Sequence, residues 1–428
     1  MADAPVIVVG AGIGGLVCAR ELRAAGREVL VLEREREVGG RVRTAHVDGY
    51  TIDRGFQVLF TAYPVLRGYL DLPALALREF LPAARIPTDD GAALIGDALR
   101  APSLLLDTIA ARGVGVTDKL RLLALRFAAT ALSVDDCFAP RFATVSARDF
   151  LRRRGLSDDV IARFFAPFYG GIFLDRSLGT SAAMLLFTFK MLAEGTTALP
   201  ARGMGAIPAQ LAASSGARVR CDATVASIEV RGDRAVGVRL AGGELVDGSD
   251  VVLAVEAPAA ARLAATAGAR PTLPEGACGC ATAYFAAAEP PLPGRALWLN
   301  PAPDAVASHA VTLTEVAPEY APAGRHLLAA TALGSAAQLG DAQLVKRAAA
   351  DVAAMRGGAA PTMELVELVR VPYAQYAQPP GFRDRRPSIA TGVHGLWLAG
   401  EALHSSSLEG AARGGRDAAR ALLAVHGA

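Results

Sequence analysis

Val6-Ile7-Val8-Val9-Gly10-Ala11-Gly12-Ile13-Gly14-Gly15 is the stretch that decides the fold of this 428-residue chain. A β-branched run ends at glycine, as a buried parallel strand does, and G-x-G-x-x-G precedes a helical pattern that continues to Gly26. Val29 to Leu32 is then predicted to form a second strand. The glycines permit a tight turn, close approach of the backbone to a pyrophosphate and close packing of helix on strand. The sequence therefore predicts a Rossmann-type βαβ unit with an anion site at the helix N-terminus.

The composition restricts the classes of function. Hydrophobic residues make up 52% and charged residues 20% of the chain, which is typical of a globular protein. The net charge of +2 gives no broad positive field, so nucleic acid is not expected as a partner. The 5 cysteines are too few for a disulfide framework, which indicates a cytoplasmic location. Cys278 and Cys280 lack a second pair or a histidine at ligand spacing, so no metal site is expected.

Charged residues follow the second predicted strand. Glu33 stands at its end, where a carboxylate can bind the two hydroxyls of an adenosine ribose. Arg34 and the run Gly39-Gly40-Arg41 come next, and a guanidinium fork such as that of Arg41 can bond two phosphate oxygens. The βαβ unit alone would suit a nicotinamide or a flavin dinucleotide, and this stretch favours FAD.

The stretch from Glu33 to Thr44 resembles the superfamily of flavin amine oxidases, protoporphyrinogen oxidases and phytoene-desaturase-like enzymes, in which Gly-Gly-Arg folds back on the FAD diphosphate. Leu398 to Glu401 and Leu408 to Ala412 are similar to the C-terminal flavin-binding signature of that superfamily. The resemblance implies that the strand-end Gly-Glu reaches the diphosphate and ribityl chain. It also implies that the start of the last helix directs N–H groups at the isoalloxazine, where a helix N-terminus stabilises negative charge.

The middle of the chain resembles the superfamily more loosely. Gly55 lies in a stretch similar to the loop beside the flavin ring, and Val225 is expected to present backbone to adenine. The cofactor-binding residues expected in all are Gly10, Gly12, Ile13, Gly14, Gly15, Glu33, Arg34, Gly39, Gly40, Arg41, Gly55, Val225, Gly400, Glu401, Glu409, Gly410 and Ala411. The FAD is expected to be noncovalent, since no cysteine follows Cys280 to anchor it as in some relatives.

The strand and helix signals indicate an α/β fold with interleaved domains. Residues 1–62, 200–256 and 388–428 are predicted to form a Rossmann-like, doubly wound FAD-binding domain. Residues 63–199, mostly helical by pattern, and the mixed part 257–387 are predicted to form an α+β substrate-binding domain. Within the first domain, a β-meander is expected from Arg218 to Val255, with turns at Gly232-Asp233 and Gly242-Gly243.

The resemblance implies an FAD-dependent oxidoreductase of desaturase or oxidase type that takes hydride from an apolar, isoprenoid- or tetrapyrrole-like substrate. Electrons would pass to oxygen, a quinone or another acceptor, since no second nucleotide fingerprint is present. Amine oxidases commonly hold a lysine near the flavin, and Lys190, the one lysine near a plausible cavity, is expected on a helix surface. A flavin amine oxidase is therefore the alternative. A non-redox flavoprotein, an isomerase or a binding module, is the alternative of another class.

No catalytic side chain is assigned from the motifs. His404 is the best-placed titratable group because it stands beside the C-terminal flavin signature. A structural or solvent-facing histidine is the commoner case, so His404 is a weak candidate for acid–base chemistry.

Neither export nor a membrane span is expected. Met1 to Pro5 lack the basic region of a signal peptide, and the apolar stretch from Leu120 to Val134 is interrupted by arginines and falls short of about 20 residues. The segment from Leu99 to Val134 could still give peripheral contact with the inner face of a membrane. Its apolar residues include Leu104-Leu105-Leu106, Leu120, Leu123 and Phe127, and its cations Arg112, Lys119, Arg121 and Arg126 could meet anionic headgroups. The alternative is that the stripe packs into the core.

Overall fold

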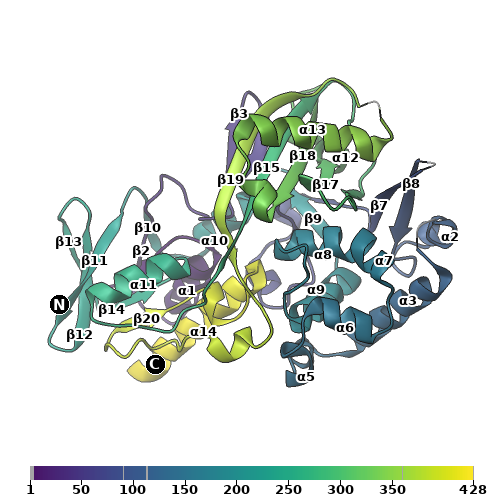
Figure 1. Ribbon diagram of the computed structural model, residues 1–428. Helices are drawn as coiled ribbons and strands as arrows, with labels where there is room; N and C mark the ends of the chain where they lie inside the picture. Colours follow the sequence, from purple (N-terminus) through teal and green to yellow (C-terminus); the bar gives the residue numbers. More distant parts are fainter. Residues whose placement is uncertain (1–3, 90, 112–113, 359, 428) are drawn as a thin grey trace.

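The computed structural model describes residues 4–89, 91–111, 114–358 and 360–427. One parallel sheet has the strand order β10-β2-β1-β14-β20 and draws its strands from three distant parts of the chain (Figure 1). The strands are β1 (Val6–Val9), β2 (Val29–Leu32), β10 (Arg218–Arg220), β14 (Asp250–Leu253) and β20 (Leu396–Leu398). Strands β1, β2, β14 and β20 are those expected of the Rossmann-like unit, whereas β10 was expected in the β-meander and instead pairs with β2. The predicted α/β fold class is confirmed.

The first and last helices lie side by side at this sheet. Helix α1 (Ile13–Ala24) follows β1, and α14 (Leu408–His426) ends the described chain. A Cβ atom on Gly415 would lie 2.1 Å from the carbonyl oxygen of Gly14, and one on Gly14 would lie 2.7 Å from the Cα of Gly400. Glycine at these positions lets the backbones touch, so the two distant segments with flavin-type motifs come together.

A second, seven-stranded sheet has the order β19-β15-β18-β17-β16-β7-β8, and α13 (Asp341–Arg356) packs on it. Its strands are β7 (Ala83–Thr88), β8 (Gly91–Gly96), β15 (Ala277–Ala287), β16 (Leu297–Leu299), β17 (Ala307–Thr312), β18 (His326–Leu333) and β19 (Glu364–Tyr376). The predicted β-meander is confirmed as β11 (Val225–Arg231), β12 (Arg234–Leu240) and β13 (Leu245–Asp247), with α11 (Ala257–Thr266) packed on β11.

Helices α2 (Leu105–Ala110) to α9 (Ala182–Glu194) form a third lobe beside the second sheet (Figure 1). The other helices of this lobe are α3 (Val116–Ala131), α4 (Val134–Cys137), α5 (Pro140–Ala143), α6 (Ala147–Arg153), α7 (Asp158–Val160) and α8 (Ala166–Phe173). Elsewhere lie β3 (Thr44–Val47), β4 (Tyr50–Asp53), β5 (Leu59–Phe60), α10 (Ala206–Ser214) and α12 (Leu313–Val316). No helix within the described ranges is long and apolar enough to cross a membrane.

The expectation that residues 63–199 are mostly helical is wrong near its two ends. Strands β6 (Leu77–Glu79), β7, β8 and β9 (Thr197–Pro200) occupy these parts. Pro82 and Pro87 disfavour a helix interior, and β7 instead pairs with β16 at one side and β8 at the other. This hairpin therefore extends the second sheet.

Candidate active site

A cavity of about 810 Å³ opens at the carboxyl ends of the parallel strands. Its lining includes the residues that follow four of these strands, at Gly10, Glu33, Ala254 and Gly400. Other parts of the lining come from residues 39–42, 54–63 and 223–226, from α8, α9, α11 and the start of α14, and from the second sheet. Ligands of open α/β folds bind at this edge of the sheet, which places the expected cofactor here.

The first turn of α1 gives the cavity an anion-binding end. Gly12 is the N-cap of α1 without a side-chain cap, and a Cβ atom there would meet no protein atom within 4 Å. The N–H groups of this first turn therefore have room for a phosphate oxygen. Gly39 donates its N–H to the Ala11 carbonyl at 2.8 Å, which folds the Gly-Gly-Arg run over the turn. The cradle fits the diphosphate of FAD.

Glu33 fixes the backbone beside this turn. Its carboxylate is buried and accepts the N–H of Ala11 at Oε2, 2.8 Å away, and the N–H of Glu35 at Oε1, 3.1 Å away. A carboxylate keeps further lone pairs after accepting two N–H bonds. Glu33 can therefore hold the turn and still accept a ribose hydroxyl.

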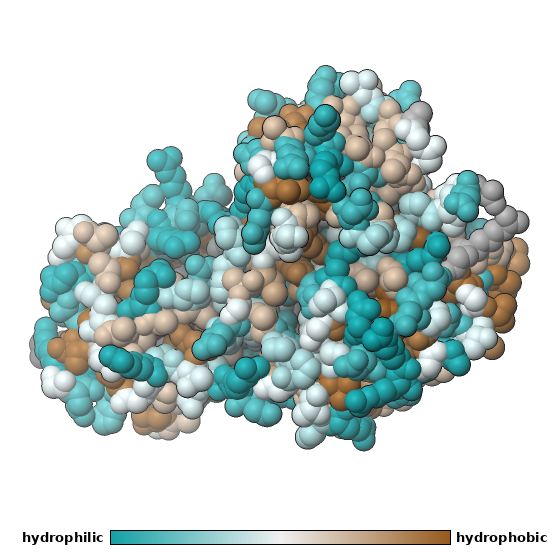
Figure 2. All heavy atoms as spheres, in the orientation of Figure 1, coloured by the Kyte–Doolittle hydropathy of each residue, from teal (hydrophilic) through white to brown (hydrophobic). Residues whose placement is uncertain are grey.

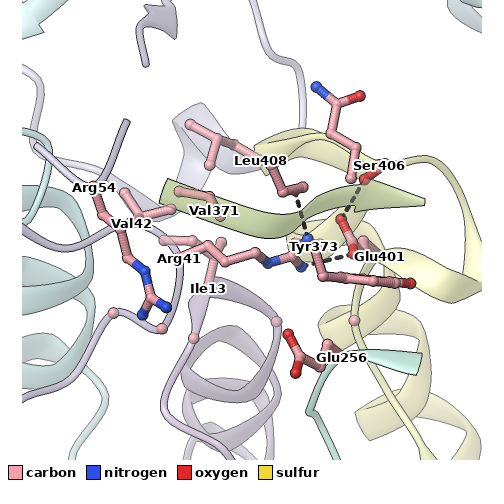
Figure 3. Close-up of a pocket in the computed structure, with 18 of the residues that line it drawn as sticks. Ile13, Arg41, Val42, Arg54, Glu256, Val371, Tyr373, Glu401, Ser406 and Leu408 are labelled. Atoms are coloured by element: carbon pink, nitrogen blue, oxygen red, sulfur yellow. Dashed lines mark hydrogen bonds and ion pairs between the residues drawn. The ribbon is translucent and has the colours of Figure 1, made fainter. Parts of the chain in front are cut away.

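Arg41 and Glu401 join the two flavin-type segments inside the cavity (Figure 3). Nη2 of Arg41 lies 2.7 Å from Oε1 of Glu401, and Nη1 donates to the Ala374 carbonyl at 2.8 Å. Ser406 donates its hydroxyl to the other carboxylate oxygen of Glu401 at 2.7 Å. The guanidinium fork that the sequence suggested for phosphate is thus directed at protein acceptors.

Arg54 is a cavity-lining cation that the sequence argument passed over (Figure 3). Among the described residues, no hydrogen bond or ion pair of its guanidinium is found. Burial and the positive charges of Arg43 and Arg34 lower the pKa of Arg54. A bound anion would relieve both effects. Arg54 precedes Gly55 in the sequence, but only Gly55 was predicted to bind the cofactor.

The other end of the cavity is apolar. Its lining includes Phe56, Phe60, Phe168, Ile172, Phe173, Met184, Phe187 and Leu297. In the part of the chain that the structure describes, the lining contributed by residues 56–63, 168–188 and 280–309 contains no aspartate, glutamate or lysine. This end therefore offers packing surface and no counter-charge for an ammonium group.

His309 is a histidine at the apolar end of the cavity that was not predicted from the sequence. It lies on β17, is 3% exposed, and its Nδ1 has no hydrogen-bond partner among the described residues. Burial, and then the charge of Arg176, lower its pKa to about 4, so the ring is neutral near pH 7. A Cβ atom on Gly171 would lie 2.8 Å from the ring, which shows how closely α8 packs there. No local motif marks His309, because strand pairing alone brings it to the cavity.

Most of the expected cofactor-binding residues line this cavity. They are Gly10, Gly12, Ile13, Gly14, Glu33, Arg34, Gly39, Gly40, Arg41, Gly55, Val225, Gly400, Glu401 and Ala411. Three of the expected positions, Gly15, Glu409 and Gly410, are not in the lining. Gly15 packs against the Gly10 carbonyl, Gly410 donates its N–H to Oγ of Ser407, and the Glu409 carboxylate accepts the N–H groups of Val65 and Leu66.

His404 and Lys190 also lie away from the cavity lining. His404 Nε2 is 2.8 Å from the Asp417 carboxylate, which favours the structural interpretation over acid–base chemistry. The expectation that Lys190 lies on a helix surface is wrong. Lys190 is buried on α9, where it pairs with Glu194 at 2.5 Å and donates to the Thr130 carbonyl. Within the described ranges, no three His, Cys, Asp or Glu residues are grouped closely enough to hold a metal ion.

Residues 13–423 match the family described as flavin containing amine oxidoreductase. Among curated proteins, the L-amino-acid oxidase of Sistrurus catenatus edwardsii is 41% identical over 75 residues. The L-amino-acid oxidase of Naja atra is 42% identical over 77 residues. These alignments cover 18% of this chain and only 14% and 15% of the relatives, respectively.

Solved structures match along the whole chain. An oxidoreductase from Methanosarcina mazei has a TM-score of 0.73 at 20% identity, covering 96% of this chain and 99% of its own. A protein assigned as a protoporphyrinogen oxidase from Exiguobacterium sp. 255-15 gives 0.73 at 19%, covering 99% of both chains. A putrescine oxidase bound to putrescine gives 0.70 at 18%, also covering 99% of both. Identities this low establish a shared fold.

Proposed function

Because the chain belongs to the flavin containing amine oxidoreductase family, whose members are FAD-dependent oxidoreductases, we propose that it removes a hydride from an apolar substrate. FAD supplies the chemistry, since its isoalloxazine accepts the hydride. The chain binds the diphosphate at α1, holds the ribose near Glu33 and positions the substrate at the apolar end of the cavity. Noncovalent attachment of the FAD is typical of the family.

The character of the apolar end carries this proposal. Phenylalanine, leucine, isoleucine and methionine side chains can hold a C–H bond close to the flavin and exclude water, but they offer no charged partner to an ion. Neutral His309 lines this end together with the uncharged polar side chains of Gln57 and Thr188, and its Nδ1 packs against Gly171 without a hydrogen-bond partner among the described residues. We therefore favour a substrate that is mostly hydrocarbon and whose few polar substituents are uncharged. Polyene and tetrapyrrole compounds are of this kind.

Amine oxidation is the second candidate, and the names of the relatives favour it. The curated relatives are L-amino-acid oxidases, and one structural neighbour was solved with putrescine bound. An amine enters such a site as a cation unless the protein takes its proton, and a buried cation needs a carboxylate or an aromatic partner. Tyr63 and Tyr373 are the tyrosines that line the cavity, and Lys190 is held elsewhere.

The experiment is anaerobic reduction of the purified holoprotein, followed by loss of the oxidised-flavin absorbance. The panel comprises a linear polyene, a porphyrinogen, putrescine and several L-amino acids. Rapid bleaching by the polyene or porphyrinogen alone supports the proposal, and rapid bleaching by an amine alone supports the second candidate. The non-redox alternative would be indicated if none of the four classes of compound reduces the flavin while the protein still isomerises one of the compounds.

A pair of variants tests whether His309 contacts the substrate. His309→Phe keeps the ring volume and removes both nitrogens, so it should raise KM for an oxygen-bearing substrate and leave a pure hydrocarbon analogue unaffected. His404→Phe is the matched control, because His404 is bonded to Asp417 outside the cavity lining. Equal kinetics for both variants and the wild type would exclude His309 from substrate binding.

A further inference from the structure

Helices α2 and α3 expose an apolar surface at one end of the molecule. Of the 12 large apolar side chains that are exposed among the described residues, 8 lie between residues 99 and 127. They are Leu99, Leu105, Leu106, Ile109, Val116, Leu120, Leu123 and Phe127. Figure 2 shows hydrophobic residues gathered at the end of the molecule where Figure 1 places α2 and α3. We call these eight residues the apolar face. Clusters of this kind mark interaction sites on soluble domains.

Helix α3 is apolar on both sides, because Leu125 and Ala129 are buried inward while another stripe is exposed. Leu120, Leu123 and Phe127 face outward, so the expectation that this stripe packs into the core is wrong. The inward side holds Asp118, whose carboxylate accepts the N–H of Ser157 at 3.0 Å and its hydroxyl at 2.6 Å. These bonds set the rotation of the helix. The exposure of the stripe is therefore built into the fold.

Cations border the apolar face. Lys119 Nζ lies between α2 and α3, where it donates to the carbonyls of Ile109 at 2.7 Å and Ala111 at 2.9 Å. Arg121 is exposed, reaches the Gly155 carbonyl beyond the end of α6, and lies 4.0 Å from the carboxylate of Asp118. Asp107, in the first turn of α2, is an exposed acidic side chain within the same surface. Carbonyl partners leave the charge of Lys119 unneutralised.

The structure differs at two positions from the membrane-contacting surface predicted between Leu99 and Val134, and a third position lies outside the described residues. Leu104 is buried, so only Leu105 and Leu106 of the leucine triplet belong to the apolar face. Arg126 is bound to Asp97 at 2.7 Å and is not a free headgroup contact. Arg112 lies outside the described residues.

We propose that the apolar face docks on the surface of a bilayer that contains anionic headgroups. Apolar side chains projecting from helices, with basic residues at their border, match the acyl boundary beneath a negatively charged headgroup layer. Helix α3 also packs against α9, and α9 supplies Met184 and Phe187 to the cavity lining. Docking therefore places α3 and then α9 between the membrane surface and the apolar end of the cavity. The proposal does not depend on which substrate the enzyme oxidises, because none of the residues of the apolar face lines the cavity.

Flotation of the holoprotein with phosphatidylcholine–phosphatidylglycerol vesicles tests the proposal. Wild type should float at low salt and less at moderate salt. The double variant Leu106→Ser/Leu120→Ser should keep the wild-type melting temperature, because both side chains are exposed, and partition at least about tenfold more weakly. The matched control is Leu365→Ser/Val425→Ser, which removes two exposed apolar side chains elsewhere and should float like wild type. Arg121→Gln should weaken flotation on the anionic vesicles but not on pure phosphatidylcholine.

Three outcomes would overturn the proposal. One is wild-type protein that stays at the bottom with both kinds of vesicle. Another is equal flotation of the Leu106/Leu120 variant and its control. The third is a dimer, seen by light scattering without vesicles, that the same double variant dissociates while no flotation occurs, since this would assign the apolar face to a second copy of the chain.

Discussion

The guanidinium of Arg41 forms an ion pair of 2.7 Å with the carboxylate of Glu401, 360 residues later in the chain. The two side chains are 28% and 11% exposed, so neither can turn freely to water when its partner is lost. The pair joins the Gly-Gly-Arg run to the end of β20. The ion pair therefore holds these two segments together at the end of the cavity where the cofactor is expected.

We expect Arg41→Ala and Glu401→Ala each to lower the free energy of unfolding by roughly 2–4 kcal/mol, because each leaves a half-buried charge unpaired. The double variant should cost clearly less than the sum of the two. Urea unfolding of the four proteins measures this. Arg78→Ala/Glu319→Ala is the control, an exposed pair whose loss should not be detectable. Strict additivity at Arg41 and Glu401 would show that the two groups do not stabilise one another.

Gly12→Ala separates cofactor binding from folding. The backbone of Gly12 has φ −76° and ψ 177°, which alanine adopts readily, and the new Cβ would meet no protein atom within 4 Å. Stability without FAD should thus be unchanged, whereas FAD titration of the apoprotein should show about tenfold or greater loss of affinity. Gly242→Ala, in an equally open turn, is the matched control. Unaltered FAD affinity in Gly12→Ala would place the diphosphate elsewhere.

Arg54→Gln should weaken FAD binding by roughly ten- to hundredfold, as expected for one charged hydrogen bond. The reason is that Arg54 lines the cavity and its charge is not paired within the described chain. Arg43 provides the comparison, since it is a neighbouring arginine that is bonded to Glu35 at 3.1 Å and is not in the lining. If Arg43→Gln and Arg54→Gln reduce FAD affinity equally, Arg54 has no specific role.

The parts of the site that the sequence predicted are local in the chain. Gly10 to Glu33 form one continuous βαβ unit, so the spacing of glycines and the carboxylate sets their positions without knowledge of the remaining fold. Glu409 shows the limit of this reasoning. Leu408 and Ala411 line the cavity, but the helical turn directs Glu409 away, to the N–H groups of Val65 and Leu66.

Residues that long-range pairing brings to the site could not be found in this way. His309 reaches the cavity because β17 pairs with β16 and β18, and nothing beside it in the sequence distinguishes it from a core histidine. The stripe on α3 illustrates a related limit. Its period predicted an amphipathic helix, but which apolar side faces the core is set by distant contacts, the bonds of Asp118 to Ser157 and the packing of Leu125 and Ala129.

Two buried titratable groups are expected to affect stability in opposite directions over the same pH range. The Asp53 carboxylate accepts the Tyr320 hydroxyl at 3.0 Å and the Met204 N–H at 2.9 Å, yet burial raises its pKa to about 6. Burial lowers the pKa of His309 to about 4. Both groups therefore titrate differently in the folded and unfolded chains between about pH 4 and pH 6.5.

The signs follow from which state binds the proton. Folded Asp53 keeps its proton up to about pH 6 while the unfolded chain releases it near 3.8, so this group destabilises the fold as pH rises through that window. Folded His309 stays neutral down to about pH 4 while the unfolded chain is protonated below about 6.5, so its stabilisation is lost as pH falls. Urea unfolding with excess FAD should show that Asp53→Asn removes the first effect and His309→Gln the second, each by roughly 2–3 kcal/mol across the window. The stability curves of the two variants should diverge from wild type in opposite directions, and parallel curves would contradict both assignments.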